Sequence, residues 1–139
     1  MNTSPWRWVL LAWVLSAVGG ATAQEVAPTK TWSSSADMDW FNPNNWTPVG
    51  VPGNGDAVLI QSGTNVLLTN STAIGLAQLV ISNRTLICSN WSTVLYATNI
   101  FLRSNGRIGL PSYFTDVHMS NRIFLVCSNL TLDAGSRLD

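Results

Sequence analysis

Short apolar runs separated by turn residues fill the chain from residue 57 onward. They lie at residues 58–60, 66–68, 79–81, 86–87 and 100–102, and each is bounded by Asn, Ser, Gly or Thr. Short runs spaced in this way by turn residues predict many short β-strands. No segment keeps the i, i+3, i+4, i+7 spacing of an amphipathic helix for long enough to predict one. The pattern therefore predicts an all-β fold.

A weak internal repeat runs through the same region. Residues 99–108 align with residues 129–138, because in both an Asn precedes alternating apolar positions, a Gly-containing turn, and an Arg followed by an aliphatic residue. A poorer copy runs from Gln78 to Leu86. Periods of roughly 20–30 residues are typical of solenoids, whose turns bury their inward residues by stacking on their neighbours. We expect β-solenoid coils over residues 57–139, with a β-sandwich as the alternative.

Residues 32–56, which precede the predicted coils, have a different residue pattern. Asn-Pro, Pro-Gly and Asn-Gly pairs punctuate this block, so it should consist mostly of turns. A loop of this length needs an internal anchor, and buried aromatic side chains would provide one. We expect a turn-rich aromatic cap built on Trp32, Trp40, Phe41 and Trp46. Residues 24–31, without periodicity, should form an exposed, flexible lead-in.

The first 23 residues have the features of a cleavable signal peptide. Arg7 supplies a positive charge, residues 8–18 form an almost wholly apolar run, and Ala21-Thr22-Ala23 supplies small residues at the −3 and −1 positions. Cleavage is expected between Ala23 and Gln24. Eleven helical residues reach only about 16 Å, short of a ~30 Å hydrocarbon core, so a membrane anchor is disfavoured. We expect an exported protein, extracellular or at a bacterial cell surface or in the periplasm, with no transmembrane segment after cleavage.

Charge and composition exclude some partners. Charged residues make up only 10% of the chain, and loss of Arg7 with the signal peptide leaves a net charge near −1. This charge balance provides no excess of positive charge that would bind nucleic acid or an anionic membrane. The roughly 116 remaining residues suffice for one modest domain. Because the pattern reaches Leu138 as a strand without a cap, we also expect further coils beyond Asp139 in a longer protein.

The cap and the coils resemble the N-terminal region of large bacterial exported proteins. The shared elements are Asn42-Pro43-Asn44-Asn45-Trp46, Gly50-Val51-Pro52 and Gly55-Asp56, followed by the strand at residues 58–60. The Leu-Thr-Leu-x-x-Gly-Ser pattern at residues 130–136 is similar to coils of autotransporter-type and other right-handed parallel β-helix surface proteins. The resemblance implies a right-handed parallel β-helix and a surface or secreted location, and it implies no activity.

Candidate metal and sulfur chemistry is sparse. Asp37, Asp39 and Asp56 offer the hard oxygen ligands that Ca²⁺ takes, although loop aspartates more often cap turns. Cys88 and Cys127 are the two cysteines. Export would permit a disulfide between them, whereas buried free thiols fit their apolar surroundings equally well. We expect no cofactor.

Candidate catalytic and sugar-binding residues are equally few. The charges of the last third could stack on one face as an alternating ladder, and His118 beside Asp116 lacks a nucleophile partner. Trp91, within a polar turn, is the aromatic residue most expected to be exposed and to contact a glycan. We therefore expect a non-catalytic, adhesin-like structural protein with extracellular glycans or polymers as partners. The alternative is a carbohydrate-active β-helix protein, a polysaccharide lyase, hydrolase or glycan-binding module, with its active part downstream.

Overall fold

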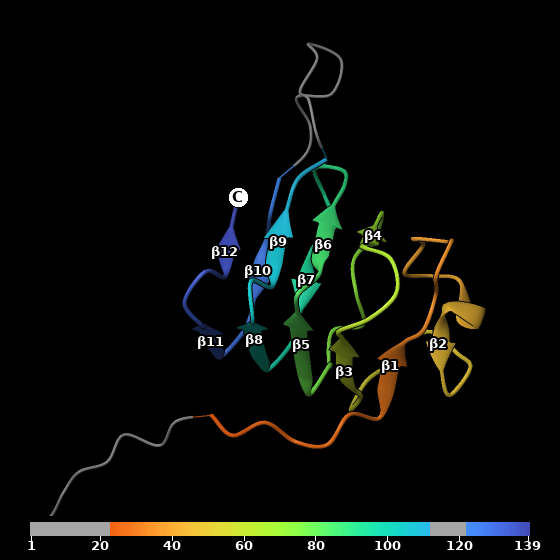
Figure 1. Cartoon of the computed structure of the whole chain (residues 1–139), viewed down its shortest axis with the longest axis horizontal. Helices are drawn as coiled ribbons and strands as arrows, with labels where there is room; N and C mark the ends of the chain where they lie inside the picture. Colours follow the sequence, from red (N-terminus) through yellow and green to blue (C-terminus); the bar gives the residue numbers. More distant parts are fainter. Residues whose placement is uncertain (1–22, 112–121) are drawn as a thin grey trace, which may run out of the picture.

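The computed structural model describes residues 23–111 and 122–139 (Figure 1). Over these residues the fold is all-β, and the only helical element among them is the 3-10 turn η1 (Pro43–Asn45). Each of the five predicted apolar runs lies within a strand. The all-β prediction is therefore confirmed. Within the described part of the chain, no helix has the length and apolar character needed to cross a membrane.

The largest sheet has six strands in the order β11-β8-β5-β3-β1-β2. Its neighbours pair in parallel, except that β1 and β2 are antiparallel. The strands are β1 (Lys30–Trp32), β2 (Trp46–Thr47), β3 (Ala57–Ile60), β5 (Gln78–Ser82), β8 (Asn99–Arg103) and β11 (Asn129–Leu132). Thus β3, β5, β8 and β11, which are successive visits of the chain to this sheet, lie side by side (Figure 1).

Two smaller sheets repeat this arrangement. A four-stranded sheet has the order β12-β9-β6-β4, and a two-stranded sheet pairs β10 with β7, with every neighbouring pair parallel. Their strands are β4 (Val66–Leu68), β6 (Thr85–Cys88), β7 (Leu95–Tyr96), β9 (Arg107–Gly109), β10 (Leu125–Val126) and β12 (Arg137–Leu138). Along the chain, β5, β6 and β7 each enter a different sheet, and β8, β9 and β10 then do the same.

Equivalent residues lie in columns across the strands. Leu79 pairs with Val58 on one side and with Ile100 on the other, and Ile100 pairs with Leu130. Asn99 lies opposite Asn129 and Arg107 opposite Arg137, the residues that the internal similarity aligns thirty positions apart. The inward columns form one core of buried aliphatic side chains between the sheets. The strand register thus places apolar side chains on apolar side chains.

An aromatic cluster closes the core beside β1 and β2. Trp32, Trp40 and Trp46 are fully buried, and the Trp46 ring meets those of Trp32 and Trp40 edge to face at 5.0 and 4.9 Å between centroids. The Trp46 indole Nε1 donates to the Trp40 carbonyl at 2.8 Å. Phe41 is half-buried against the same core. The aromatic residues of the turn-rich block thus pack together at this end of the core.

The segment before β1, expected to be an exposed, flexible lead-in, has hydrogen bonds to the rest of the fold. Its residues 24–29 are exposed, but Val26 and Thr29 are hydrogen-bonded to Gln78 and Ala57 of the six-stranded sheet, and β1 begins at Lys30. Hydrophobic periodicity cannot reveal such a segment, because polar side chains and backbone groups hold it. Residues 1–22 of the predicted signal peptide, which comprises residues 1–23, lie outside the described residues.

Candidate functional site

The three last strands form an open end of the fold. Among the described strands, β11 is an edge of the six-stranded sheet, β12 is an edge of the four-stranded sheet, and β10 pairs only with β7. The backbone N–H and C=O groups on the outer side of such edges are available to pair with another strand. We call these three strands the open edge.

Apolar side chains line the open edge. Leu130 follows the buried Leu79 and Ile100 in its column yet is 39% exposed, and Leu132 follows the buried Leu102 yet is 42% exposed. The same change from buried to partly exposed occurs at Leu138, which lies opposite the buried Ile108 and is 39% exposed. The inward columns of the two larger sheets thus end at the open edge in partly exposed side chains.

An aromatic and cationic cluster lies next to the two-stranded sheet. Trp91 is 55% exposed, as its polar turn predicted. The Arg122 guanidinium carbon lies 4.6 Å from the centroid of the Trp91 ring and 4.7 Å from that of Phe124. Both distances fall within the range of cation–π attraction. The sequence pattern missed Arg122, because thirty-one residues separate it from Trp91 and only the fold brings them together.

The three aspartates considered as calcium ligands serve as turn acceptors. The Asp37 carboxylate accepts from the Asp39 N–H and the Asn42 amide, and these hydrogen bonds lower its pKa. Asp39 accepts from the Phe41 N–H at 2.9 Å. Within the described ranges, no group of three or more His, Cys, Asp or Glu side chains is arranged to hold a metal ion. Turn hydrogen bonds thus explain the Asp-x-Asp pattern at Asp37 and Asp39. Turn capping was the alternative to a calcium site.

Asp56 belongs to a different turn. It accepts from the Gly53 N–H at 2.8 Å and from the Thr29 hydroxyl at 2.7 Å. Burial raises the pKa of this carboxyl, but the hydrogen bonds and the charge of Lys30 outweigh burial, so the pKa lies below its ordinary value. Asp56 therefore joins the segment before β1 to the turn before β3.

The two cysteines are free thiols in the structure. Cys88 ends β6 in the four-stranded sheet and is buried, whereas Cys127 follows β10 and is half-buried. Burial raises the pKa of the Cys88 thiol to about 11. Of the two alternatives, the structure has the free thiols, and Cys88 and Cys127 form no disulfide in it.

The charges of the last third lie on the outside of the strands. Arg103 forms ion pairs with Glu25 and Asp133, both at 2.5 Å, and the hydrogen bond with Glu25 is the largest influence raising its pKa. Arg107 and Arg137 lie opposite one another in β9 and β12, and both pair with Asp139. This is the alternating ladder considered from the sequence. Asp116 and His118 lie outside the described residues.

Comparison with known families identifies one match. The family model described as the G8 domain matches residues 45–134, which is more than half of the chain and extends from η1 to just after β11. No curated protein and no solved structure matches the chain. The family description names a domain and no activity, so the resemblance to bacterial exported β-helix proteins stays a prediction.

Proposed function

The chain belongs to the G8 domain family, and on that premise we propose that it is the capped N-terminal part of an exported structural protein. In this proposal the G8 domain is a right-handed parallel β-solenoid, adhesin-like and without catalysis of its own. Its coils continue past Leu138. Extracellular polymers or surface glycans are the partners that we expect for the longer protein.

The parallel pairing supports the solenoid over the β-sandwich. Sandwiches are built from antiparallel sheets, whereas the only antiparallel pair among the described strands is β1 with β2. One proposed coil consists of β5, β6 and β7, and the next of β8, β9 and β10, each adding one parallel strand to every sheet. Parallel strands in one sheet require a crossover, which is nearly always right-handed. In each proposed coil, the crossover consists of the strands that enter the other two sheets.

The open edge is the observation that carries the proposal. Its half-exposed leucines lie in register with residues of the preceding strands that are fully buried. Among the described strands, none pairs with the outer backbone N–H and C=O groups of these three strands. A further coil with aliphatic residues in the same register would cover both. The other end differs, because the tryptophan cluster and the antiparallel β2 close it. A fold closed at one end and open at the other favours a terminal module of a longer stack.

Export is supported by the signal-peptide pattern at residues 7–23 and by the low charge of the remaining chain. The test is the natural product in its own cells. Antibodies against residues 24–139 should detect, outside the cytoplasm, a polypeptide clearly longer than this 15.1 kDa chain. Its first residue by N-terminal sequencing should be Gln24. A cytoplasmic product would contradict export, and a natural product ending at Asp139 would contradict further coils.

A second candidate function, glycan binding, is favoured by one observation. Arg122 covers part of the Trp91 ring, yet Trp91 stays 55% exposed, as an aromatic platform for a sugar ring would need to be. Trp91→Ala should weaken retention of the exported protein on a glycan array. Ile74→Ala is the matched control, since Ile74 is also exposed and apolar but has no aromatic ring. Equal retention of both variants would remove this candidate.

A further inference from the structure

The outer side of β11 has the geometry of an unfinished parallel sheet. The Asn129 and Asp133 N–H groups donate to backbone carbonyls on the β8 side, at 3.1 and 2.9 Å. In a parallel ladder, successive residues direct their backbone groups to opposite sides, so those of Leu130 and Leu132 point away from β8. Among the described strands, none lies on that side. The backbone there can receive one more strand.

A column of amide side chains reaches the same edge. Gln78, Asn99 and Asn129 lie opposite one another in β5, β8 and β11. The inner end of the column is closed, because Gln78 Oε1 accepts from the Val26 N–H at 2.8 Å and its Nε2 donates to the Val26 carbonyl at 3.0 Å. At the outer end, Asn129 Nδ2 donates inward to Asn99 Oδ1 at 2.8 Å, and no donor within the described part of the chain binds Asn129 Oδ1. An amide on an added strand would continue the column by donating to that oxygen.

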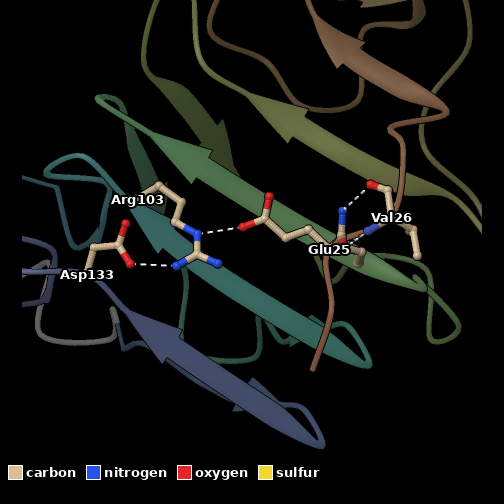
Figure 2. Close-up of polar contacts among 5 residues, drawn as sticks. Glu25, Val26, Arg103 and Asp133 are labelled. Atoms are coloured by element: carbon tan, nitrogen blue, oxygen red, sulfur yellow. Dashed lines mark hydrogen bonds and ion pairs between the residues drawn. The ribbon is translucent and has the colours of Figure 1, made fainter. Parts of the chain in front are cut away.

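The charges beside this edge are unequal. Arg103, at the end of β8, forms ion pairs with Glu25 and with Asp133, both at 2.5 Å (Figure 2). Two carboxylates therefore share one guanidinium, and the outer one, that of Asp133, directly follows β11 on a side chain that is 41% exposed. Opposite charges on facing residues of neighbouring strands attract one another, whereas like charges repel. A strand added outside β11 should therefore carry a basic residue opposite Asp133.

The exposed leucines determine how such a strand must align. Leu130 and Leu132 are on the core side of β11, like the buried Ile100 and Leu102 opposite them in β8. A shift of one residue would turn every side chain of an added strand to the other face. Aliphatic residues opposite the two leucines therefore fix the alignment, and the amide and the cation then lie on the outer face. β8 itself has this pattern, as Asn99-Ile100-Phe101-Leu102-Arg103.

We propose that the outer edge of β11 is an acceptor site for a parallel strand with the pattern Asn-aliphatic-x-aliphatic-basic. The occupant is the first strand of the next coil, so this inference rests on the further coils proposed above and specifies their chemistry. The Asn donates to Asn129, the two aliphatic side chains cover Leu130 and Leu132, and the basic residue pairs with Asp133. For this pattern, only the parallel direction and one register make all of these contacts together.

The test attaches such a strand to the protein of residues 24–139. A segment with the sequence of residues 97–104 follows Asp139 through about 20 Gly and Ser residues, whose r.m.s. reach of about 25 Å holds the segment at millimolar effective concentration. Hydrogen exchange at the Leu130 and Leu132 amides should become at least about tenfold slower than in the protein without the segment. The Leu79 amide of β5 should stay protected in every variant, which verifies folding. Exchange is measured where sedimentation velocity shows a monomer, because a second copy on this edge would slow the same amides.

Matched variants of the segment test the pattern. Arg103→Glu in the segment should make the two leucine amides exchange about two- to fivefold faster than with the unchanged segment, the scale of an exposed ion pair. In an Asp133→Asn protein this difference between the two segments should vanish. Asn99→Leu in the segment should also speed the exchange, and Ile100→Asp with Leu102→Asp in the segment should remove the slowing altogether. Equal slowing by all of these segments would overturn the proposed pattern.

The acceptor site and the proposed function can fail separately. Exchange at Leu130 and Leu132 that is unchanged by the attached segment would overturn the acceptor site, while the length of the natural product would still test the further coils. A natural product ending at Asp139 would contradict the further coils as the occupant, whereas slowed exchange would still support an acceptor site for this strand pattern.

Discussion

At the scale of single residues, the same side-chain type has different roles in different surroundings. Trp46 is fully buried, donates its indole hydrogen bond to a backbone carbonyl and packs against two other indoles. Trp91 is more than half exposed and contacts Arg122. Both residues are tryptophans, but only Trp46 holds the cap together. This difference leads directly to a comparison of two variants.

Trp46→Ala should lower the free energy of unfolding by about 3–5 kcal/mol, since it leaves a large cavity and an unpaired Trp40 carbonyl. Trp91→Ala should lower it by no more than about 1 kcal/mol, the scale of an exposed cation–π contact. Urea denaturation of both variants against the wild type measures the difference. Similar losses in the two variants would show that the aromatic cluster does not anchor the cap.

Cys88 predicts a dependence of stability on alkaline pH. Burial raises the pKa of its thiol from 9.0 to about 11, so the folded state keeps the proton that the unfolded chain releases above pH 9. Its contribution is fully present below pH 9 and is lost as the pH rises through 11. Cys88→Ala removes this titration. The wild type should therefore lose on the order of 2 kcal/mol more than Cys88→Ala between pH 8 and 11, measured by denaturation at each pH. Parallel curves for the two proteins would contradict the shift.

At the scale of elements, turns set where each strand begins. β8 ends at Arg103 and β9 starts at Arg107, and the Gly106 N–H donates to the Arg103 carbonyl at 2.7 Å to close the turn between them. A Cβ on Gly106 would lie 2.1 Å from the Ile81 carbonyl oxygen in the neighbouring strand. The absence of a side chain there allows two backbone segments to approach one another.

Gly106→Ala should therefore destabilise the protein by at least about 2 kcal/mol, because backbone and not a flexible side chain must move. Gly55→Ala serves as the control. Gly55 has a φ of +84° but nothing within 4 Å of a built Cβ, so only the left-handed backbone cost of about 1–2 kcal/mol applies. Thermal denaturation compares them, and an equal or smaller effect at Gly106 would show that the two strands can separate freely at this point.

At the scale of the whole molecule, the two ends of the strand stack are unlike. The tryptophan cluster closes one end, and β10, β11 and β12 leave exposed apolar residues and unpaired edges at the other. Open apolar edges pair with other chains unless they are covered or charged. The edge formed by β10, β11 and β12 is therefore expected to pair with a strand of another chain.

A protein of residues 24–139 should accordingly self-associate as its concentration rises. Leu132→Lys places a charge on the open edge and should shift the population toward monomer by about tenfold in the association constant, measured by sedimentation velocity. Val49→Lys introduces the same charge at an exposed apolar residue of the cap, away from the edge, and should leave association unchanged. Association that is insensitive to Leu132→Lys would place the contact elsewhere.

The sequence by itself determined the features that depend on neighbouring residues. Apolar runs between turn residues predicted β3, β4, β5, β6 and β8, and the Pro- and Asn-rich block between Trp32 and Asp56 was the expected aromatic cap. The similarity of residues 99–108 to residues 129–138 anticipated which of them lie opposite one another. Strand periodicity, turn formation and repeat spacing are local properties, so they are readable without coordinates.

Only the tertiary structure decided how distant polar groups pair. Val26 meets Gln78 across 52 residues, and Glu25 meets Arg103 across 78. Such pairs carry no periodic signal, because they form where stacking brings unrelated parts of the chain together. The partial exposure of Leu130 and Leu132 likewise depends on the place of β11 at the sheet edge and not on its residues, which follow the same pattern as those of the buried β8.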